Sequence, residues 1–222
     1  MRAAVAVFVA LLAACDRLPG RPLEADRPLP PRDVHDFARL WSENCVGCHG
    51  ADGVLGPATA LANPVYLAWA NDDATLTRVI TDGVPGTAMP GFAVSAGGYL
   101  TDEQIALLVR GMRTRWATGP AISGLPPYAG GAGDVTRGAA VYRQRCAACH
   151  DEGGKGTPHG GSVVDPAYLA LVSDQALRTA VVAGRPDLGM PDWRGAGGEA
   201  PLGAQEVSDV VAWMASHRGG GA

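Results

Sequence analysis

Two pentapeptides decide the predicted fold and function of this chain: Cys45-Val46-Gly47-Cys48-His49 and Cys146-Ala147-Ala148-Cys149-His150. They hold four of the five cysteines in the 222-residue sequence, and the fifth is Cys15. Two cysteine pairs would ordinarily suggest a disulfide framework or a four-thiolate zinc site. Here the pairs lie 101 residues apart, and a histidine follows each pair directly. The zinc and disulfide interpretations leave that histidine unexplained.

The Cys-x-x-Cys-His spacing suits a flat ring with a metal at its centre. On a helical turn, residues i and i+3 point the same way, so two thiols can reach two substituents of one ring. The histidine that follows is then placed to reach the metal. This is the attachment pattern of c-type haem, with two thioether bonds and the imidazole as proximal iron ligand. The sequence therefore predicts two covalently bound haem c groups.

Other readings of the cysteine pairs are weaker. A redox dithiol of the thioredoxin type needs a surrounding βαβ pattern, and strand alternation is nowhere convincing here. A zinc ribbon usually places its cysteine pairs much closer than 101 residues. Gly (31) and Pro (17) make up more than a fifth of the chain, which favours short elements and many turns. We therefore expect an all-α fold of short helices.

The two motifs belong to an internal duplication. Four pairs of segments match: Trp41 with Tyr142, Pro57 with Pro158, residues 63–68 (NPVYLA) with 165–170 (DPAYLA), and 89–92 (MPGF) with 190–193 (MPDW). Between the copies lies a stretch rich in Gly and Pro that carries no charge. The predicted organisation is two tandem domains, residues 33–118 and 134–222, joined by a linker over residues 119–133.

Capping residues and apolar stripes mark the helices. Asp72-Asp73 is predicted to cap a helix over residues 74–82 that ends at Gly83. Thr101 and Gln104 fit a capping box at the start of the last helix of the first copy. The apolar stripe of that helix is Ile105, Leu108, Val109, Met112 and Trp116, and the second copy repeats it with Val207, Val210, Val211 and Met214.

With these features the chain resembles the class I cytochrome c family, and specifically dihaem bacterial cytochromes built from two such domains. The resemblance implies three to five short helices around each haem. It also implies that Pro57 and Pro158 each offer a carbonyl to the second ring nitrogen of the preceding motif's histidine, which fixes the ring orientation. In the family a glycine lets the terminal helices cross closely. Gly138 matches that glycine, but the first copy has Phe37 there, so its helix crossing must differ.

Met89 and Met190 are the predicted sixth iron ligands. Each lies 40 residues after its histidine and precedes a proline, which favours an extended backbone. The family supplies its distal methionine from such a loop. The alternative role for a methionine is to fill a gap in the core, which suits Met112 and Met214 on the last helix of each copy. The remaining histidines, which are rival ligands, are interpreted as surface residues: His35, His159 and His217.

The N-terminus indicates export. Residues 3–14 form an apolar run of 12 residues after Arg2, as in a secretory signal. Residues 12–15 (LAAC) resemble the bacterial lipobox, which implies a signal peptide over residues 1–14 and lipidation of Cys15. An ordinary signal peptide with an incidental cysteine is the alternative. Residues 15–32 are rich in proline and are predicted to form an extended tether on the periplasmic side of the cell membrane.

Histidine–methionine ligation leaves no open iron site, which favours electron transfer over catalysis. We therefore expect a membrane-tethered electron carrier, not an enzyme, with no catalytic residue. It would act between a respiratory or photosynthetic donor, such as a quinol-oxidising complex or a dehydrogenase, and a terminal oxidase or reductase. The alternative is a dihaem redox enzyme, peroxidase-like or oxidising sulfur compounds, with one labile haem ligand. A net charge of −4 and a single lysine, Lys155, argue against a nucleic-acid partner.

Overall fold

The computed structural model describes residues 27–70 and 72–219. The predicted signal peptide, the lipidation site at Cys15 and most of the predicted tether lie outside these residues. The chain divides into two units, Met1–Asp33 and Val34–Ala222. The described part of the first unit includes the 3-10 helix η3 (Pro31–Asp33). The second unit contains both cysteine motifs.

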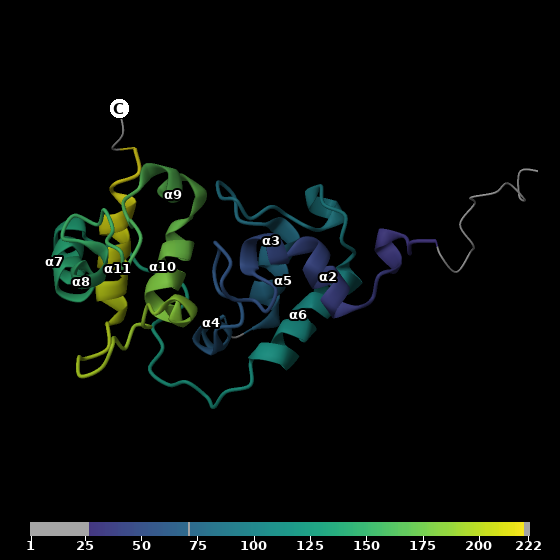
Figure 1. Ribbon diagram of the computed structural model, residues 1–222, viewed down its shortest axis with the longest axis horizontal. Helices are drawn as coiled ribbons and strands as arrows, with labels where there is room; N and C mark the ends of the chain where they lie inside the picture. The colour runs from purple at the N-terminus through teal and green to yellow at the C-terminus, as the bar shows by residue number, and fades with distance from the viewer. Residues whose placement is uncertain (1–26, 71, 220–222) are drawn as a thin grey trace, which may run out of the picture. The chain divides into compact units, whose positions relative to one another are not determined.

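The second unit repeats one order of helices (Figure 1). Its first half comprises α2 (Phe37–Asn44), α3 (Val46–His49), α4 (Pro64–Trp69), α5 (Asp73–Asp82), η4 (Val94–Ala96) and α6 (Asp102–Trp116). Its second half comprises α7 (Val135–Arg145), α8 (Ala147–His150), α9 (Pro166–Leu171), α10 (Asp174–Ala183), η5 (Pro186–Leu188) and α11 (Ala204–Ala215). Over the described residues the chain forms only isolated β-bridges and no strand, which confirms the all-α prediction.

Local sequence accounts for where the helices start and stop. The Thr101 hydroxyl accepts the Gln104 N–H (3.2 Å) and the Gln104 side chain accepts the Thr101 N–H (3.0 Å), so the predicted capping box is confirmed. Asp72 caps α5 by accepting the Thr75 N–H. Gly83 ends α5 with a φ of 69°, a left-handed conformation that glycine adopts without strain.

In each half the first and last helices cross at a glycine. The glycine lies on the first helix in one half and on the last helix in the other. In the second half, a Cβ added to Gly138 of α7 would lie 2.0 Å from the Asp209 carbonyl oxygen on α11. In the first half the matching position is Phe37 of α2, and the small residue is Gly111 on α6. The predicted difference between the two crossings is therefore present.

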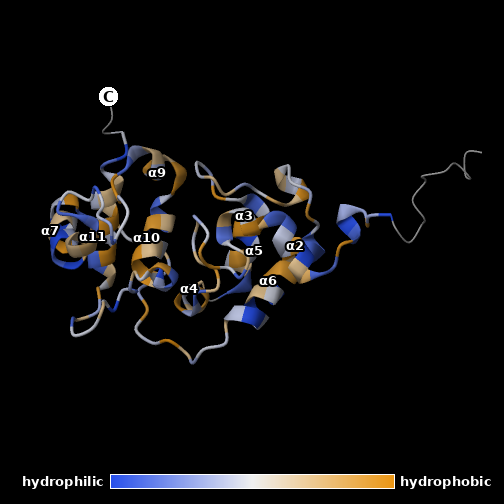
Figure 2. Cartoon of the chain, in the orientation of Figure 1, coloured by the Kyte–Doolittle hydropathy of each residue, from blue (hydrophilic) through white to orange (hydrophobic). Residues whose placement is uncertain are grey.

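The linker packs against both halves of the unit. The Trp69 indole N–H donates to the Pro126 carbonyl (2.6 Å), and the Arg178 guanidinium donates to the Pro127 carbonyl (2.7 Å). The Tyr128 ring lies 4.8 Å from that of Trp69. One core cluster contains residues from α4 and α6 together with residues of the second half, such as Val182. Figure 2 shows apolar residues interspersed with polar ones along α6 and α10, as expected of helices with one buried face.

Candidate haem sites

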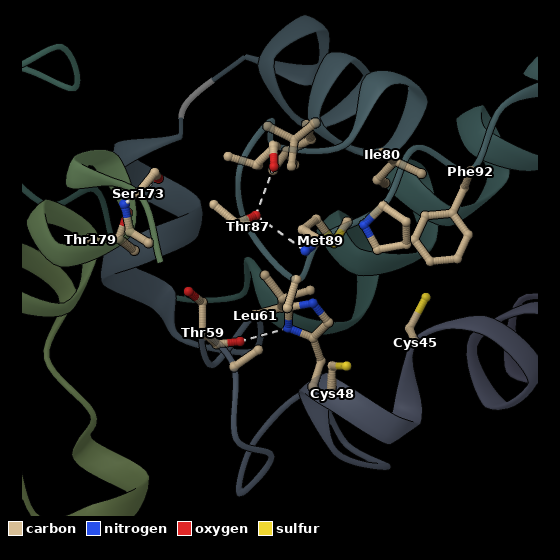
Figure 3. A pocket seen from close by; sticks show the side chains of 18 of the residues that line it. Cys45, Cys48, Thr59, Leu61, Ile80, Thr87, Met89, Phe92, Ser173 and Thr179 are labelled. Atoms are coloured by element: carbon tan, nitrogen blue, oxygen red, sulfur yellow. Dashed lines mark hydrogen bonds between the residues drawn. The ribbon is translucent and has the colours of Figure 1, made fainter. Parts of the chain in front are cut away.

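The first cysteine motif faces an apolar cavity (Figure 3). Cys45, Cys48 and His49 line it, and so does Met89 from the loop after α5. Most of its other lining side chains from the first half are apolar: Trp41, Leu61, Leu76, Val79, Ile80, Val84, Phe92, Leu100, Leu108 and Met112. The fold thus brings two thiols, an imidazole and a thioether to one apolar space. That donor set and that lining fit haem c.

The His49 ring is oriented by a backbone carbonyl. Its Nδ1 lies 2.8 Å from the Thr59 carbonyl oxygen. A carbonyl oxygen only accepts hydrogen bonds, so Nδ1 carries the ring proton and Nε2 keeps its lone pair. Burial lowers the pKa of His49, which also keeps the ring neutral. A neutral imidazole with a free Nε2 is the form that binds a metal.

His150 is held in the same way, with Nδ1 2.7 Å from the Gly161 carbonyl oxygen. The predicted acceptors, the carbonyls of Pro57 and Pro158, are therefore wrong: the acceptor lies two or three residues later. Pro57 has no N–H to donate, and the hydrogen bond that holds this loop in the first half is donated by the next residue, from the Ala58 N–H to the Cys48 carbonyl (2.9 Å). The carbonyl that contacts the His49 ring belongs to the residue after Ala58, which is Thr59.

Burial favours the protonated thiol at the first cysteine of each motif. Burial raises the pKa of Cys45 to about 12 and that of Cys146 to about 11. Reactive dithiols show the opposite shift, because their function requires a thiolate. The four described cysteines are free of disulfides, and the described residues include no cluster of three or more His, Cys, Asp or Glu suited to a metal ion. The dithiol and zinc interpretations therefore gain no support.

Hydrogen bonds define the two methionine loops. The Met89 carbonyl accepts the Val84 N–H (3.0 Å), and the Met190 carbonyl accepts the Arg185 N–H (3.0 Å). Both loops begin at a glycine with positive φ, the second being Gly184. A Cβ at Gly184 would lie 2.4 Å from the Pro191 carbonyl oxygen, so only glycine allows this approach.

The other methionines and histidines occupy varied positions. Met112 and Met214 are 2% and 5% exposed, as predicted for core residues, although Met112 also lines the cavity. His35 and His159 are exposed. His217 was predicted at the surface but is half-buried, because its ring packs edge-on against Trp213 at 4.8 Å.

An ion pair beside Met190 joins the two halves, and no motif in the sequence predicts it. The Arg185 guanidinium donates to the Asp187 carboxylate (2.8 Å) and to the carbonyls of Gly56 (2.9 Å) and Ala58 (3.1 Å). The Asp187 carboxylate also accepts the Leu55 N–H (2.9 Å). The loop that leads to the His49 acceptor is thus tied to the Met190 loop. One feature of the sequence could have indicated this contact: Arg185 and Asp187 carry opposite charges at the positions where the first copy has Val84 and Gly86.

The repeated helical fold and two complete Cys-x-x-Cys-His sites define a dihaem cytochrome c. The chain belongs to the family described as cytochrome c oxidase, cbb3-type, subunit III, which matches residues 32–110 and 133–214.

Curated relatives are similar over part of their length. The chain is 34% identical over 128 residues to the cbb3-type cytochrome c oxidase subunit CcoP of Azospirillum sp. (strain B510), covering 52% of this chain and 38% of that protein. It is 26% identical over 163 residues to subunit FixP of Bradyrhizobium diazoefficiens, covering 70% and 53%. It is 25% identical over 208 residues to subunit FixPc of Rhizobium leguminosarum bv. viciae, covering 89% and 66%. The chain therefore spans between about two fifths and two thirds of these relatives.

Proposed function

We propose that this chain is the electron-transferring dihaem cytochrome of a cbb3-type oxidase complex. The observation that carries the proposal is a family match over both halves of the chain, each with its own Cys-x-x-Cys-His motif. The relatives are named as subunits of such an oxidase. The oxidase would be the acceptor, and a quinol-oxidising complex or a dehydrogenase would be the donor.

In this proposal each half holds one haem c. Cys45 and Cys48 would hold the first haem through thioether bonds, and His49 and Met89 would bind its iron. Cys146 and Cys149 would hold the second haem, and His150 and Met190 would bind its iron. Haem iron, when bound, supplies one-electron exchange between its ferric and ferrous states. The ordered imidazole and the apolar lining of the first cavity support this assignment.

The chain's own residues are suited to electron transfer. The carbonyls of Thr59 and Gly161 hold the histidine rings in one orientation, and hydrogen bonds hold the methionine loops. Rigid ligands keep the geometry similar in the two oxidation states, which suits outer-sphere transfer. With a histidine and a methionine bound to each iron, no coordination position would be left for a substrate, so we propose electron transfer rather than catalysis at these sites.

We also propose that the protein acts on the periplasmic side of the membrane, attached through a lipid on Cys15. The support is the apolar run and lipobox-like sequence before Cys15. No helix among the described residues has the length and hydropathy needed to cross a membrane. In the producing bacterium, Cys15→Ser should move the protein from the membrane to the soluble fraction. Retention of this variant in the membrane would contradict the lipid anchor.

The decisive experiment is purification of the tagged protein from a host that matures c-type cytochromes. Intact mass should show two added haem groups, and the chain should co-purify with the catalytic subunits of the oxidase. Oxygen consumption by a deletion strain should fall and should recover with the wild-type gene. A bare polypeptide would overturn the haem assignment, and a dihaem chain that neither co-purifies with nor reduces the oxidase would overturn the proposed partner. Rapid binding of carbon monoxide to the reduced protein would instead favour the enzyme alternative.

A further inference from the structure

The cavity at the first motif has a wall that comes from the second half of the chain. Besides residues 41–112, it is lined by the linker and by the region around the start of α10: Tyr128, Leu171, Val172, Ser173, Gln175, Ala176 and Thr179. Figure 3 shows Ser173 and Thr179 on one side of Met89, and Cys45 and Phe92 on the other. The second half therefore closes the side of the cavity that faces away from Cys45.

Hydrogen bonds hold this wall against the first half. The Ala88 N–H, next to Met89, donates to the Leu171 carbonyl (3.3 Å). The Asn63 side chain, which is 2% exposed, donates to the Ala183 carbonyl at the end of α10 (2.7 Å). The wall is thus attached near both ends of the segment that contains α10.

The linker is attached to the same helix. The Arg178 guanidinium is buried and donates to the carbonyls of Pro127 (2.7 Å) and Tyr128 (3.2 Å). The Gln175 amide donates to the Tyr128 carbonyl as well (3.2 Å). Tyr128 and the start of α10 therefore form one surface of the cavity.

Haem c has a defined direction in such a cavity. Its two thioether bonds leave from adjacent pyrrole rings, and its two propionates leave from the other two rings. With Cys45 and Cys48 bonded, the propionate edge lies on the far side of the iron from the cysteines. Propionates are carboxylates, and a carboxylate removed from water requires hydrogen-bond donors or cations.

Hydroxyl donors are available along this wall. The Ser173 hydroxyl accepts the Ala176 N–H (3.1 Å), which leaves its own O–H to donate. Tyr66 of α4 and Tyr128 of the linker also line the cavity. Burial raises the pKa of both tyrosines, so their hydroxyls stay protonated and able to donate. In the repeat, Tyr168 corresponds to Tyr66 but is 37% exposed, so the two candidate sites differ here.

We infer that the second half of the chain completes the haem site of the first: Ser173 and the linker's Tyr128 face the propionate edge of the first haem and donate to its carboxylates. This inference rests on the proposed function, because it requires haem c on Cys45 and Cys48. It makes the potential of the first haem depend on residues far along the chain from its cysteines: Tyr128 lies 80 positions after Cys48, and Ser173 lies 125 positions after it.

The test compares Ser173→Asp with Ser173→Asn. Aspartate and asparagine cap a helix about equally well, so both variants keep the start of α10, and only one adds a negative charge to the wall. Added negative charge disfavours reduction. We expect the first haem to be roughly tenfold harder to reduce in Ser173→Asp than in Ser173→Asn, which is about 59 mV for one electron. The second haem should shift less.

Spectroelectrochemical titration measures both potentials, and a Met89→His background identifies the wave of the first haem. A second variant, Tyr128→Phe, keeps the ring against Trp69 but removes the hydroxyl, and it should also lower the first potential. Equal potentials in the two Ser173 variants, or a shift of the second haem alone, would overturn the inference while both haems remain attached and the proposed function stands. A chain without haem on Cys45 and Cys48 would overturn both.

Discussion

Gly111 of α6 lies directly against the ring of Phe37 of α2: a Cβ added at position 111 would be 2.0 Å from Cδ2 of Phe37. The repeat pairs Phe37 with Gly138 and Gly111 with Trp213, so the two halves carry the large and the small residue on opposite helices. Each half has an aromatic contact beside the crossing, but the tryptophan comes from a different position of the last helix. Trp116 packs edge-on against Trp41 at 4.8 Å, and Trp213 stacks on Tyr142 at 4.0 Å.

The first prediction concerns these crossings. Gly111→Ala should lower the free energy of unfolding of the haem-loaded protein by about 1–3 kcal/mol, because the Phe37 ring must move. Gly138→Ala should cost more, since its neighbour is the Asp209 backbone, which cannot rotate away. Denaturant unfolding measures both.

Gly131→Ala is the matched control, because nothing lies within 4 Å of a Cβ at that position. Its free energy of unfolding should match that of the wild type. Phe37→Leu should recover part of the loss caused by Gly111→Ala but none of the loss caused by Gly138→Ala. Equal costs for the two glycine substitutions would contradict this account of the helix crossings.

The second prediction concerns the sixth ligands. Met89→Ala and Met190→Ala should each abolish about half of the methionine–iron absorption band, because each removes one of two proposed thioether ligands. Met214→Leu is the control: Met214 is 5% exposed in the core and does not line the first cavity, so a swap that conserves volume should leave the band intact. If both alanine variants keep the full band, the ligand assignment is wrong.

The third prediction concerns the ion pair of Arg185 and Asp187, whose side chains are 16% and 7% exposed. Asp187→Asn should lower the free energy of unfolding by about 1–3 kcal/mol, because it leaves a largely buried guanidinium without its counter-charge. Asp192→Asn is the control, since its partner Arg194 is 53% exposed and two residues away. That change should cost less than about 1 kcal/mol. Similar costs for both would show that the pair does not stabilise the contact between the halves.

The fourth prediction concerns acid stability. Hydrogen bonds from Arg137 to Asp209 (2.7 and 2.9 Å) hold the pKa of that carboxyl well below its ordinary value of 3.8. A carboxyl with a depressed pKa in the folded state stabilises the protein above its unfolded pKa. This contribution is lost progressively as the pH falls from about 4 towards the lower pKa of the folded state. Asp209→Asn should therefore lower the free energy of unfolding at neutral pH. Between about pH 5 and 2 this free energy should fall less steeply than in the wild type. The prediction would be contradicted if the free energy of unfolding of this variant fell with acid as steeply as that of the wild type.

Most of what the linear sequence predicted depends on residues a few positions apart. The Cys-x-x-Cys-His motifs, the Thr101 capping box and the glycine that ends α5 are local patterns, and helix geometry acts over the same short distances. Because the sequence is duplicated, a role predicted for a residue in one half could be assigned to the matching residue in the other half. For this reason the helical fold and the two Cys-x-x-Cys-His motifs could be recognised from the sequence, whereas the carbonyl that contacts each histidine was predicted wrongly.

The tertiary structure alone decided how distant segments meet. It placed the Thr59 carbonyl on His49 in preference to that of Pro57, Gly111 under Phe37, Arg185 against Gly56, and Ser173 in the wall of the first cavity. These contacts join residues from 10 to more than 120 positions apart, and no periodicity encodes them. Chain packing fixes them, because buried carbonyls, charges and side-chain volumes must each find a partner wherever the folded chain supplies one.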